Sequence, residues 1–188
     1  MDLQKAKGNN ENFDACKSLN WYEPRQETLP NPNLFFRKLS ESSPLSSCFV
    51  VDGGGTALYA GFQSVFLKKG QRIVCSSAIS AMGTGLAETI GVFTANKFEK
   101  LYCIIGDGSF LMNIQDLQNI KAMAIPVIII VINNNGYLAI RHTQSDFLEG
   151  RLHGTHPHWS LEMPVIEKLA AGFGIEYQRV DDKDEVET

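Results

Sequence analysis

The sequence predicts a three-layer α/β/α fold, in which helices cover both faces of a doubly wound, mostly parallel sheet. Apolar runs such as Val127–Ile132 show no polar alternation, which is typical of strands that are covered on both faces. Helical segments separate these runs along most of the chain. Strict alternation of strand and helix implies right-handed crossovers between parallel strands, and therefore helices on both sides of one sheet.

The predicted elements follow one another in chain order. The predicted strands are Cys48–Val51, Arg72–Cys75, Leu101–Ile105, Val127–Ile132 and Glu176–Val180. The predicted helices are Thr56–Lys69, ended by Gly70, and Gly83–Asn96, Asn113–Ala124 and Pro164–Ala171. Beyond Asn135 the chain is expected to be irregular as far as the tract His153–Trp159, and residues 181–188 begin another helical pattern.

Composition limits the domain organisation and the kinds of partner. Residues 1–33 are polar and end in three prolines, which predicts a linker or extension, and 34–188 are predicted to form one domain. The net charge of -4, with no long basic run, excludes nucleic acid as an expected partner. The apolar runs are too short to span a bilayer and the N-terminus does not resemble a signal peptide, so we expect a soluble, cytoplasmic protein with no membrane partner.

The four cysteines and the histidine tract are not expected to bind metal. Cysteines 16, 48, 75 and 103 are widely scattered, which favours free and largely buried thiols. His153, His156 and His158 are close together, but no cysteine or acidic residue accompanies them and the tract contains a proline. A solvated or interfacial loop is the favoured interpretation of this tract.

Three glycine-containing loops follow predicted strands, at the sheet edge where open parallel sheets bind their ligands. The first, Asp52–Thr56, opens a helix, so its N–H groups could bind an anion, although a tight strand-to-helix turn is the favoured interpretation of this loop taken alone. A dinucleotide fingerprint fails, because its third glycine would fall at Leu58.

The second and third loops constrain each other. Asp107 and Asn134 lie 27 residues apart, about the length of one helix and one strand, so both return to the same sheet edge. Carboxylate, amide and backbone carbonyl oxygens, together with a diphosphate, suit octahedral Mg²⁺. The alternative is that Asp107 caps a helix and the asparagines occupy left-handed turn positions, which explains each loop but not the matched spacing.

The strings GDGSFLMNIQDL and PVIIIVINNNGY resemble the cofactor motif of thiamine diphosphate-dependent enzymes, and the likeness extends back to about Phe49. It is closest to the C-terminal cofactor domain of the acetolactate synthase catalytic subunit. The resemblance implies that Asp107, the Asn134 side chain and the Gly136 carbonyl bind Mg²⁺. It also implies that the N–H groups of Gly108, Ser109 and Tyr137 face the diphosphate, and that Gly106 belongs to the cofactor-binding loop.

The same resemblance implies roles for residues upstream. Met82 matches the bulky residue that supports the bent shape of the cofactor, although a flexible core residue is the alternative. Ser80 falls where relatives contact the pyrimidine through the backbone. Gly54, Gly55 and Thr56 align with the loop that binds the far phosphate.

Two positions depart from the acetolactate synthase pattern. Thr56 and Ala57 replace a glutamine and a histidine, so part of the phosphate contact falls to the hydroxyl and the backbone. Thr143 replaces a tryptophan that shapes the pocket for the second keto acid, which leaves the substrate open. Arg141 and His142 could meet a carboxylate or phosphorylated substrate, or could simply be exposed polar residues.

The resemblance implies an enzyme that decarboxylates a small 2-oxo acid and transfers the resulting carbanion to a second carbonyl. The activating glutamate of the family lies on a pyrimidine-binding domain that nothing here matches. That domain is the expected partner, in the same or a second polypeptide, within a homodimer or larger oligomer. The isolated domain is expected to be inactive, whether it is cut from a longer enzyme or is a natural subunit. Alternatives are a non-ligating 2-oxo acid decarboxylase, including one acting on a phosphonate-, sulfo- or sugar-linked substrate, and a non-catalytic nucleotide-binding or regulatory module.

Overall fold

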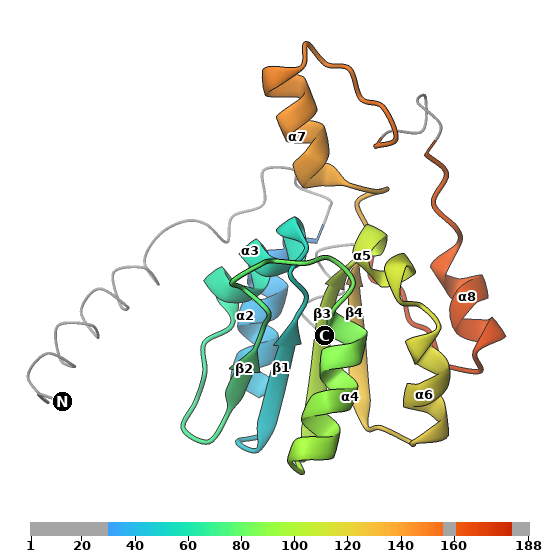
Figure 1. Cartoon of the computed structure of the whole chain (residues 1–188). Helices are drawn as coiled ribbons and strands as arrows, with labels where there is room; N and C mark the ends of the chain where they lie inside the picture. Colours follow the sequence, from blue (N-terminus) through green and yellow to red (C-terminus); the bar gives the residue numbers. More distant parts are fainter. Residues whose placement is uncertain (1–29, 156–160, 182–188) are drawn as a thin grey trace, which may run out of the picture.

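The computed structural model describes residues 30–155 and 161–181. They form a parallel four-stranded sheet in the order β2-β1-β3-β4, with helices on both faces (Figure 1). The strands are β1 (Ser47–Val51), β2 (Arg72–Val74), β3 (Lys100–Gly106) and β4 (Val127–Ile132). The predicted α/β class with a parallel sheet is therefore confirmed, and all four strands lie within two residues of their predicted bounds.

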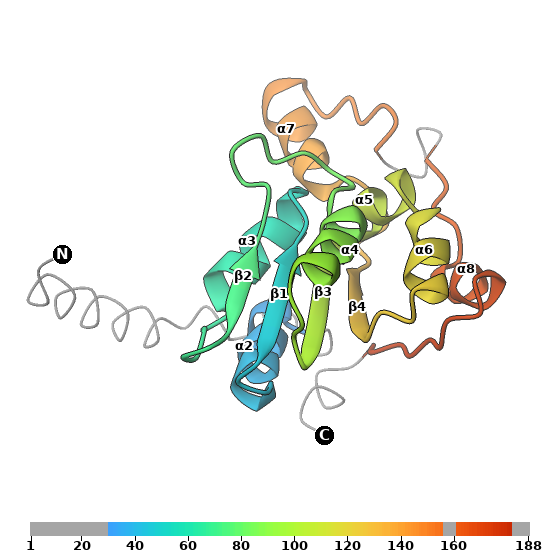
Figure 2. The same ribbon diagram turned by 60° about the horizontal axis from the view of Figure 1, so that its bottom comes forward.

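Alternate residues along the central strands build two separate cores. One contains Phe49 and Val51 of β1 with Tyr102 and Ile104 of β3, and faces α2 (Pro32–Ser42) and α3 (Gly55–Ser64). The other face packs against α4 (Gly85–Ala95), α6 (Asp116–Ala122) and α8 (Ile166–Gly172). Turning the molecule shows the sheet between these two helical layers (Figure 2). A sheet buried on both faces explains the unbroken apolar runs.

The structure corrects several predicted elements. Helix α2 was not predicted, although Asn31 caps it by accepting N–H groups of Asn33 and Leu34, with Pro32 in its first turn. Helix α3 ends at Ser64 rather than at Lys69. The predicted helix Asn113–Ala124 is present as the shorter α6, and α5 (Asp107–Met112), which precedes it, was not predicted. The chain beyond Asn135 was expected to be irregular, but it forms α7 (Leu138–Phe147).

The last predicted strand was wrong, because residues 176–180 form no strand in the structure. The linker predicted over 1–33 lies mostly outside the described residues, and α2 begins within its last two positions. Cys48 and Cys103 are buried free thiols, as expected, whereas Cys75 is half-buried and Cys16 lies outside the described residues. Within the described ranges, no helix is long and apolar enough to cross a membrane.

Candidate functional site

A cavity lies beyond the carboxyl ends of β1, β3 and β4, on the side where α7 projects (Figure 1). Eleven of the twelve residues with a predicted binding role line it, together with Leu138, Ala139 and Ile140. The eleven are Gly54, Gly55, Thr56, Met82, Gly106, Asp107, Gly108, Ser109, Asn134, Gly136 and Tyr137. Residues from four separate loops are thus brought to one place.

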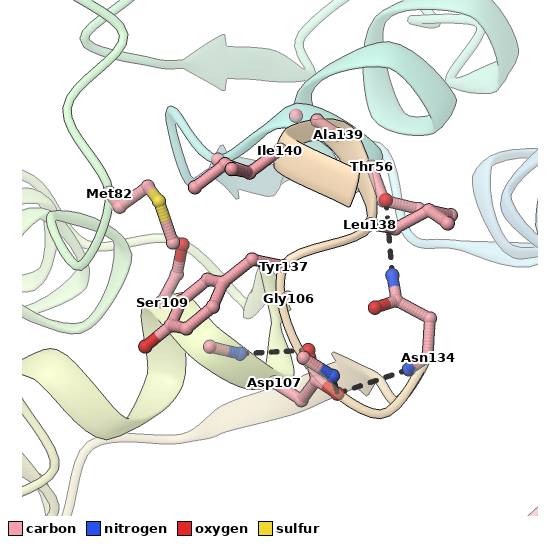
Figure 3. A pocket seen from close by; sticks show the side chains of 14 residues that line it. Thr56, Met82, Gly106, Asp107, Ser109, Asn134, Tyr137, Leu138, Ala139 and Ile140 are labelled. Carbon is pink, nitrogen blue, oxygen red and sulfur yellow. Dashed lines mark hydrogen bonds between the residues drawn. The ribbon is translucent and has the colours of Figure 1, made fainter. Parts of the chain in front are cut away.

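Asp107 organises the floor of this cavity. Its side chain is 2% exposed and accepts three backbone N–H groups. Oδ2 accepts from Asn134 at 3.1 Å and from Gly136 at 2.8 Å, and Oδ1 accepts from Gly108 at 2.8 Å (Figure 3). Burial raises the pKa of this carboxyl, against the opposing effect of the three N–H groups and of the nearby Arg141.

Asn134, whose backbone N–H binds this carboxylate, carries an unsatisfied side-chain oxygen. Its side-chain amide donates from Nδ2 to the Thr56 hydroxyl at 3.1 Å, which joins the loop after β4 to the start of α3. Its Oδ1 is buried and has no hydrogen-bond partner. A buried carbonyl oxygen without a donor is costly, unless a cation or a ligand donor occupies the space that it faces.

Gly136 is the backbone component of the same group. Its φ of +114° lies in the left-handed region, and a Cβ there would approach Leu161 Cδ2 to 2.3 Å, so only glycine fits without rearrangement. Its carbonyl accepts the Leu138 N–H at 3.1 Å, which leaves a second lone pair on that oxygen. Asp107, Asn134 and Gly136 therefore offer carboxylate, amide and backbone oxygens together, the donor set that Mg²⁺ prefers. This arrangement fits the predicted metal site.

Three further predicted residues differ in how they stand to the cavity. The Gly108 N–H donates to Asp107 Oδ1, and a Cβ added at Gly108 would meet the Tyr137 ring at 2.4 Å. Ser80 does not line the cavity: its hydroxyl donates to the Ser77 carbonyl, and its backbone lies against Gly53. Met82 does reach the cavity, with its thioether directed toward Ser109 in Figure 3.

Sequence reasoning missed the role of Asp52. This residue is fully buried, and it accepts the Gly54 N–H at 2.8 Å and the Gly85 N–H at 3.0 Å. It therefore ties the glycine loop after β1 to the turn that follows Met82. The signal was available, because an aspartate directly after a buried strand must find donors within the fold.

The residues near the mouth of the cavity also bear on the sequence analysis. Arg141 is half-buried, and its guanidinium donates to three backbone carbonyls. His142 and Thr143 are exposed on α7. His153 is exposed, whereas His156 and His158 lie outside the described residues. In the part of the chain that is described, no three His, Cys, Asp or Glu side chains gather as a metal site.

Comparison with known proteins decides the family. The sequence profile described as "Thiamine pyrophosphate enzyme, C-terminal TPP binding domain" matches residues 53–188. The chain belongs to this thiamine pyrophosphate enzyme family. The matched region contains all four loops that line the cavity.

Relatives within this family are acetolactate synthases. The chain is 30% identical over 154 residues to acetolactate synthase isozyme 2 large subunit of Escherichia coli (strain K12), which covers 82% of this chain and 27% of the relative. It is 34% identical over 124 residues to the acetolactate synthase large subunit of Porphyra purpurea, covering 65% of this chain and 21% of the relative. The chain thus spans about a quarter of the length of these curated relatives.

Proposed function

We propose that this chain binds thiamine diphosphate through Mg²⁺, with Asp107, the Asn134 side chain and the Gly136 carbonyl as the protein ligands of the metal. The observation that carries the proposal is Asn134 Oδ1, which is buried without a partner on a residue whose backbone N–H binds the Asp107 carboxylate. A divalent cation would satisfy this oxygen and would favour the ionised form of Asp107.

The remaining cavity residues are proposed to hold and shape the cofactor. Gly54, Gly55 and Thr56 begin helix α3 and would receive the far phosphate at its N-terminal end. Ser109 and Tyr137 would contact the diphosphate, and the backbone at Ser80 the pyrimidine. Met82 would support the bent shape. When bound, thiamine diphosphate supplies the electron sink that allows the bond between the two carbonyl carbons of a 2-oxo acid to break.

For the whole enzyme we propose an acetolactate synthase-like reaction, in which a small 2-oxo acid is decarboxylated and joined to a second carbonyl compound. The sequence likeness to an acetolactate synthase over 82% of this chain supports this reaction class. The second candidate is a decarboxylase that does not ligate. It is favoured by Thr143, a small exposed residue at the position where a tryptophan would shape the acceptor pocket.

The catalytic unit is proposed to need a pyrimidine-binding domain, from the same or a second polypeptide, within a homo-oligomer. Two large apolar side chains are exposed on the segments that carry cavity residues: Ile140, which lines the cavity, is 43% exposed, and Ile79, three residues before Met82, is 84% exposed. A partner domain there would supply the activating carboxylate and would exclude water from the reacting carbon. The chain alone is accordingly expected to bind the cofactor weakly and to show no turnover.

Calorimetric titration with thiamine diphosphate, with and without Mg²⁺, tests the proposal. We expect binding that requires Mg²⁺ and is lost in Asp107→Ala, whereas the exposed acid Asp146 on α7 provides the control variant Asp146→Ala. Equal binding by Asp107→Ala and the parent would refute the metal assignment. Nucleotide binding without any thiamine diphosphate binding would instead indicate a non-catalytic module. Robust pyruvate decarboxylation by the chain alone would contradict the need for a partner domain.

A further inference from the structure

Arg141 of α7 makes an unusual set of contacts behind the proposed metal loop. Nη2 donates to the Asn134 carbonyl at 2.8 Å, and Nη1 donates to the carbonyls of Asn135 at 2.9 Å and Thr155 at 3.0 Å. The guanidinium therefore ends on backbone oxygens of two segments that are about 20 residues apart in sequence. It serves to hold backbone in place.

One of these contacts grips the same peptide unit as Asp107. The Asn135 carbonyl and the Gly136 N–H belong to one planar trans peptide, so they point in opposite directions. Arg141 holds the carbonyl end at 2.9 Å, while Asp107 Oδ2 holds the N–H end at 2.8 Å. This peptide plane is consequently fixed from both sides.

The preceding peptide unit is fixed in the same way. Its carbonyl, from Asn134, accepts from Arg141, and its N–H, from Asn135, donates to Asn133 Oδ1 at 3.1 Å. The turn contains two successive residues with positive φ, Asn135 at 59° and Gly136 at 114°. Such a conformation persists only where the surrounding structure holds it, and Arg141 contributes to both of the peptide units concerned.

The third contact extends the support to residues 153–155. Gln144 lies three residues after Arg141, on the same face of α7. Its Nε2 donates to the His153 carbonyl at 3.1 Å, and its Oε1 accepts from the Thr155 hydroxyl. Thr155 is 4% exposed, so this segment is seated firmly on the helix.

We propose that Arg141 is a positioning residue for the metal site: it locks the Asn134–Gly136 turn in the shape that presents Asn134 Oδ1 and the Gly136 carbonyl, and it couples that turn to residues 153–155. The proposal rests on the proposed function. Arg141 reaches the two carbonyls of the turn with separate nitrogens of a rigid guanidinium, whereas a lysine would have to contact both from one ammonium nitrogen.

The first test is amide hydrogen exchange of the full chain without ligand. Arg141→Met is expected to raise exchange at least tenfold in peptides covering both 134–136 and 153–155, with Arg141→Lys intermediate. Arg151→Met is the matched control, since Arg151 lies nearby but is exposed and pairs with Glu149. Unchanged exchange at 134–136 in Arg141→Met, with the strands of the sheet still protected, would overturn the proposal. If Arg141→Met does not fold, the comparison is made with Arg141→Lys, and unchanged exchange at 134–136 in that variant would overturn the proposal.

The second test is the Mg²⁺ dependence of thiamine diphosphate binding. Arg141→Met is expected to need about 10–100 times more Mg²⁺ than the parent for half-maximal binding, and excess Mg²⁺ should restore binding. Gln144→Ala should loosen only 153–155 and leave the Mg²⁺ requirement near that of the parent. An equal loss in both variants would mean that the effect passes through residues 153–155, against the proposal. If the parent binds no cofactor, the proposed function fails. The hydrogen-exchange comparison would still test whether Arg141 fixes the Asn134–Gly136 turn.

Discussion

Asp52 and Asp107 occupy equivalent places at the carboxyl ends of the adjacent strands β1 and β3, and each carboxylate joins two loops by accepting their backbone N–H groups. Asp52 joins the loop after β1 to the start of α4. Asp107 joins the start of α5 to the loop after β4. The cavity is therefore framed by two buried carboxylates, although only Asp107 lines it.

Asp52→Asn should destabilise the protein and loosen the cavity. An asparagine keeps one acceptor oxygen but turns an amide NH₂ toward one of the two N–H groups, leaving that buried donor unsatisfied. The expected loss in the free energy of unfolding is about 1–3 kcal/mol, measured by urea denaturation. The exposed control Asp146→Asn should change it by less than about 0.5 kcal/mol. A loss no larger than that of the control would show that Asp52 does not secure these loops.

Gly54→Ala should disturb the cavity, whereas Gly91→Ala should not. A Cβ at Gly54 would lie 2.4 Å from Ser109 Oγ and 2.8 Å from Asp52 Oδ2. At Gly91, inside α4, nothing lies within 4 Å, so alanine should raise stability by about 0.5–1 kcal/mol through helix propensity. The thermal unfolding temperature should thus fall for Gly54→Ala and rise for Gly91→Ala, and thiamine diphosphate titration should change for Gly54→Ala alone. Parent-like binding by Gly54→Ala would contradict the tight approach of these loops.

Asn134→Ala should weaken cofactor binding but leave the stability of the fold nearly unchanged. The change removes the unpartnered Oδ1, whose burial is costly, but also removes the hydrogen bond to Thr56. The two effects oppose each other, so the free energy of unfolding should stay within about 1 kcal/mol of the parent. Mg²⁺-dependent cofactor binding should nevertheless fall at least tenfold. A large loss of stability together with intact binding would contradict the assignment of Asn134 Oδ1 as a metal ligand.

Glu88 of α4 should make stability depend on pH. Burial raises the pKa of its carboxyl, the nearby Asp52 charge adds to this, and contacts with Thr84 and the Ser76 backbone partly oppose it; its Oε2 has no partner. The pKa of Glu88 is therefore higher in the folded than in the unfolded state. Its contribution to the free energy of unfolding is fully present at a pH below the unfolded-state pKa, and it is lost as the pH rises through the folded-state pKa.

The variant Glu88→Gln provides the measurement. It cannot ionise, so its stability relative to the parent should increase as pH rises from acid to neutral. Denaturation of both proteins across that range gives the difference, in which the other titrating groups largely cancel. A difference that stays constant with pH would show that Glu88 has the same pKa in both states.

The sheet could be predicted from the sequence because its strands are buried on both faces, and burial leaves an unbroken apolar run such as Val127–Ile132. Helix α7 could not, since none of its residues is buried and most of its side chains, in the segment LAIRHTQSDF, are polar. The strand expected over 176–180 failed for a related reason: a strand exists only where a neighbour pairs with it, and a local pattern does not supply the neighbour.

The cavity was predictable to a similar degree. The spacing of Asp107 and Asn134 brought both to one sheet edge, and the structure places them in contact. The contacts of Arg141 with the turn were not predicted, because its partners are backbone carbonyls, which no sequence pattern reveals. The role of Asp52 in joining two loops was not predicted either, since its second partner, Gly85, lies 33 residues away in the sequence.

The turn at Asn134–Gly136 loses its conformational freedom when the chain folds, because Asp107 and Arg141 hold opposite ends of one peptide unit. Ordering a backbone residue costs about 1–2 kcal/mol in entropy. A ligand arriving at this turn would not bear that cost for the residues already fixed, so more of its contact energy would appear as affinity. The left-handed turn thus acts as a preorganised receptor, whose order is established before any ion or cofactor arrives.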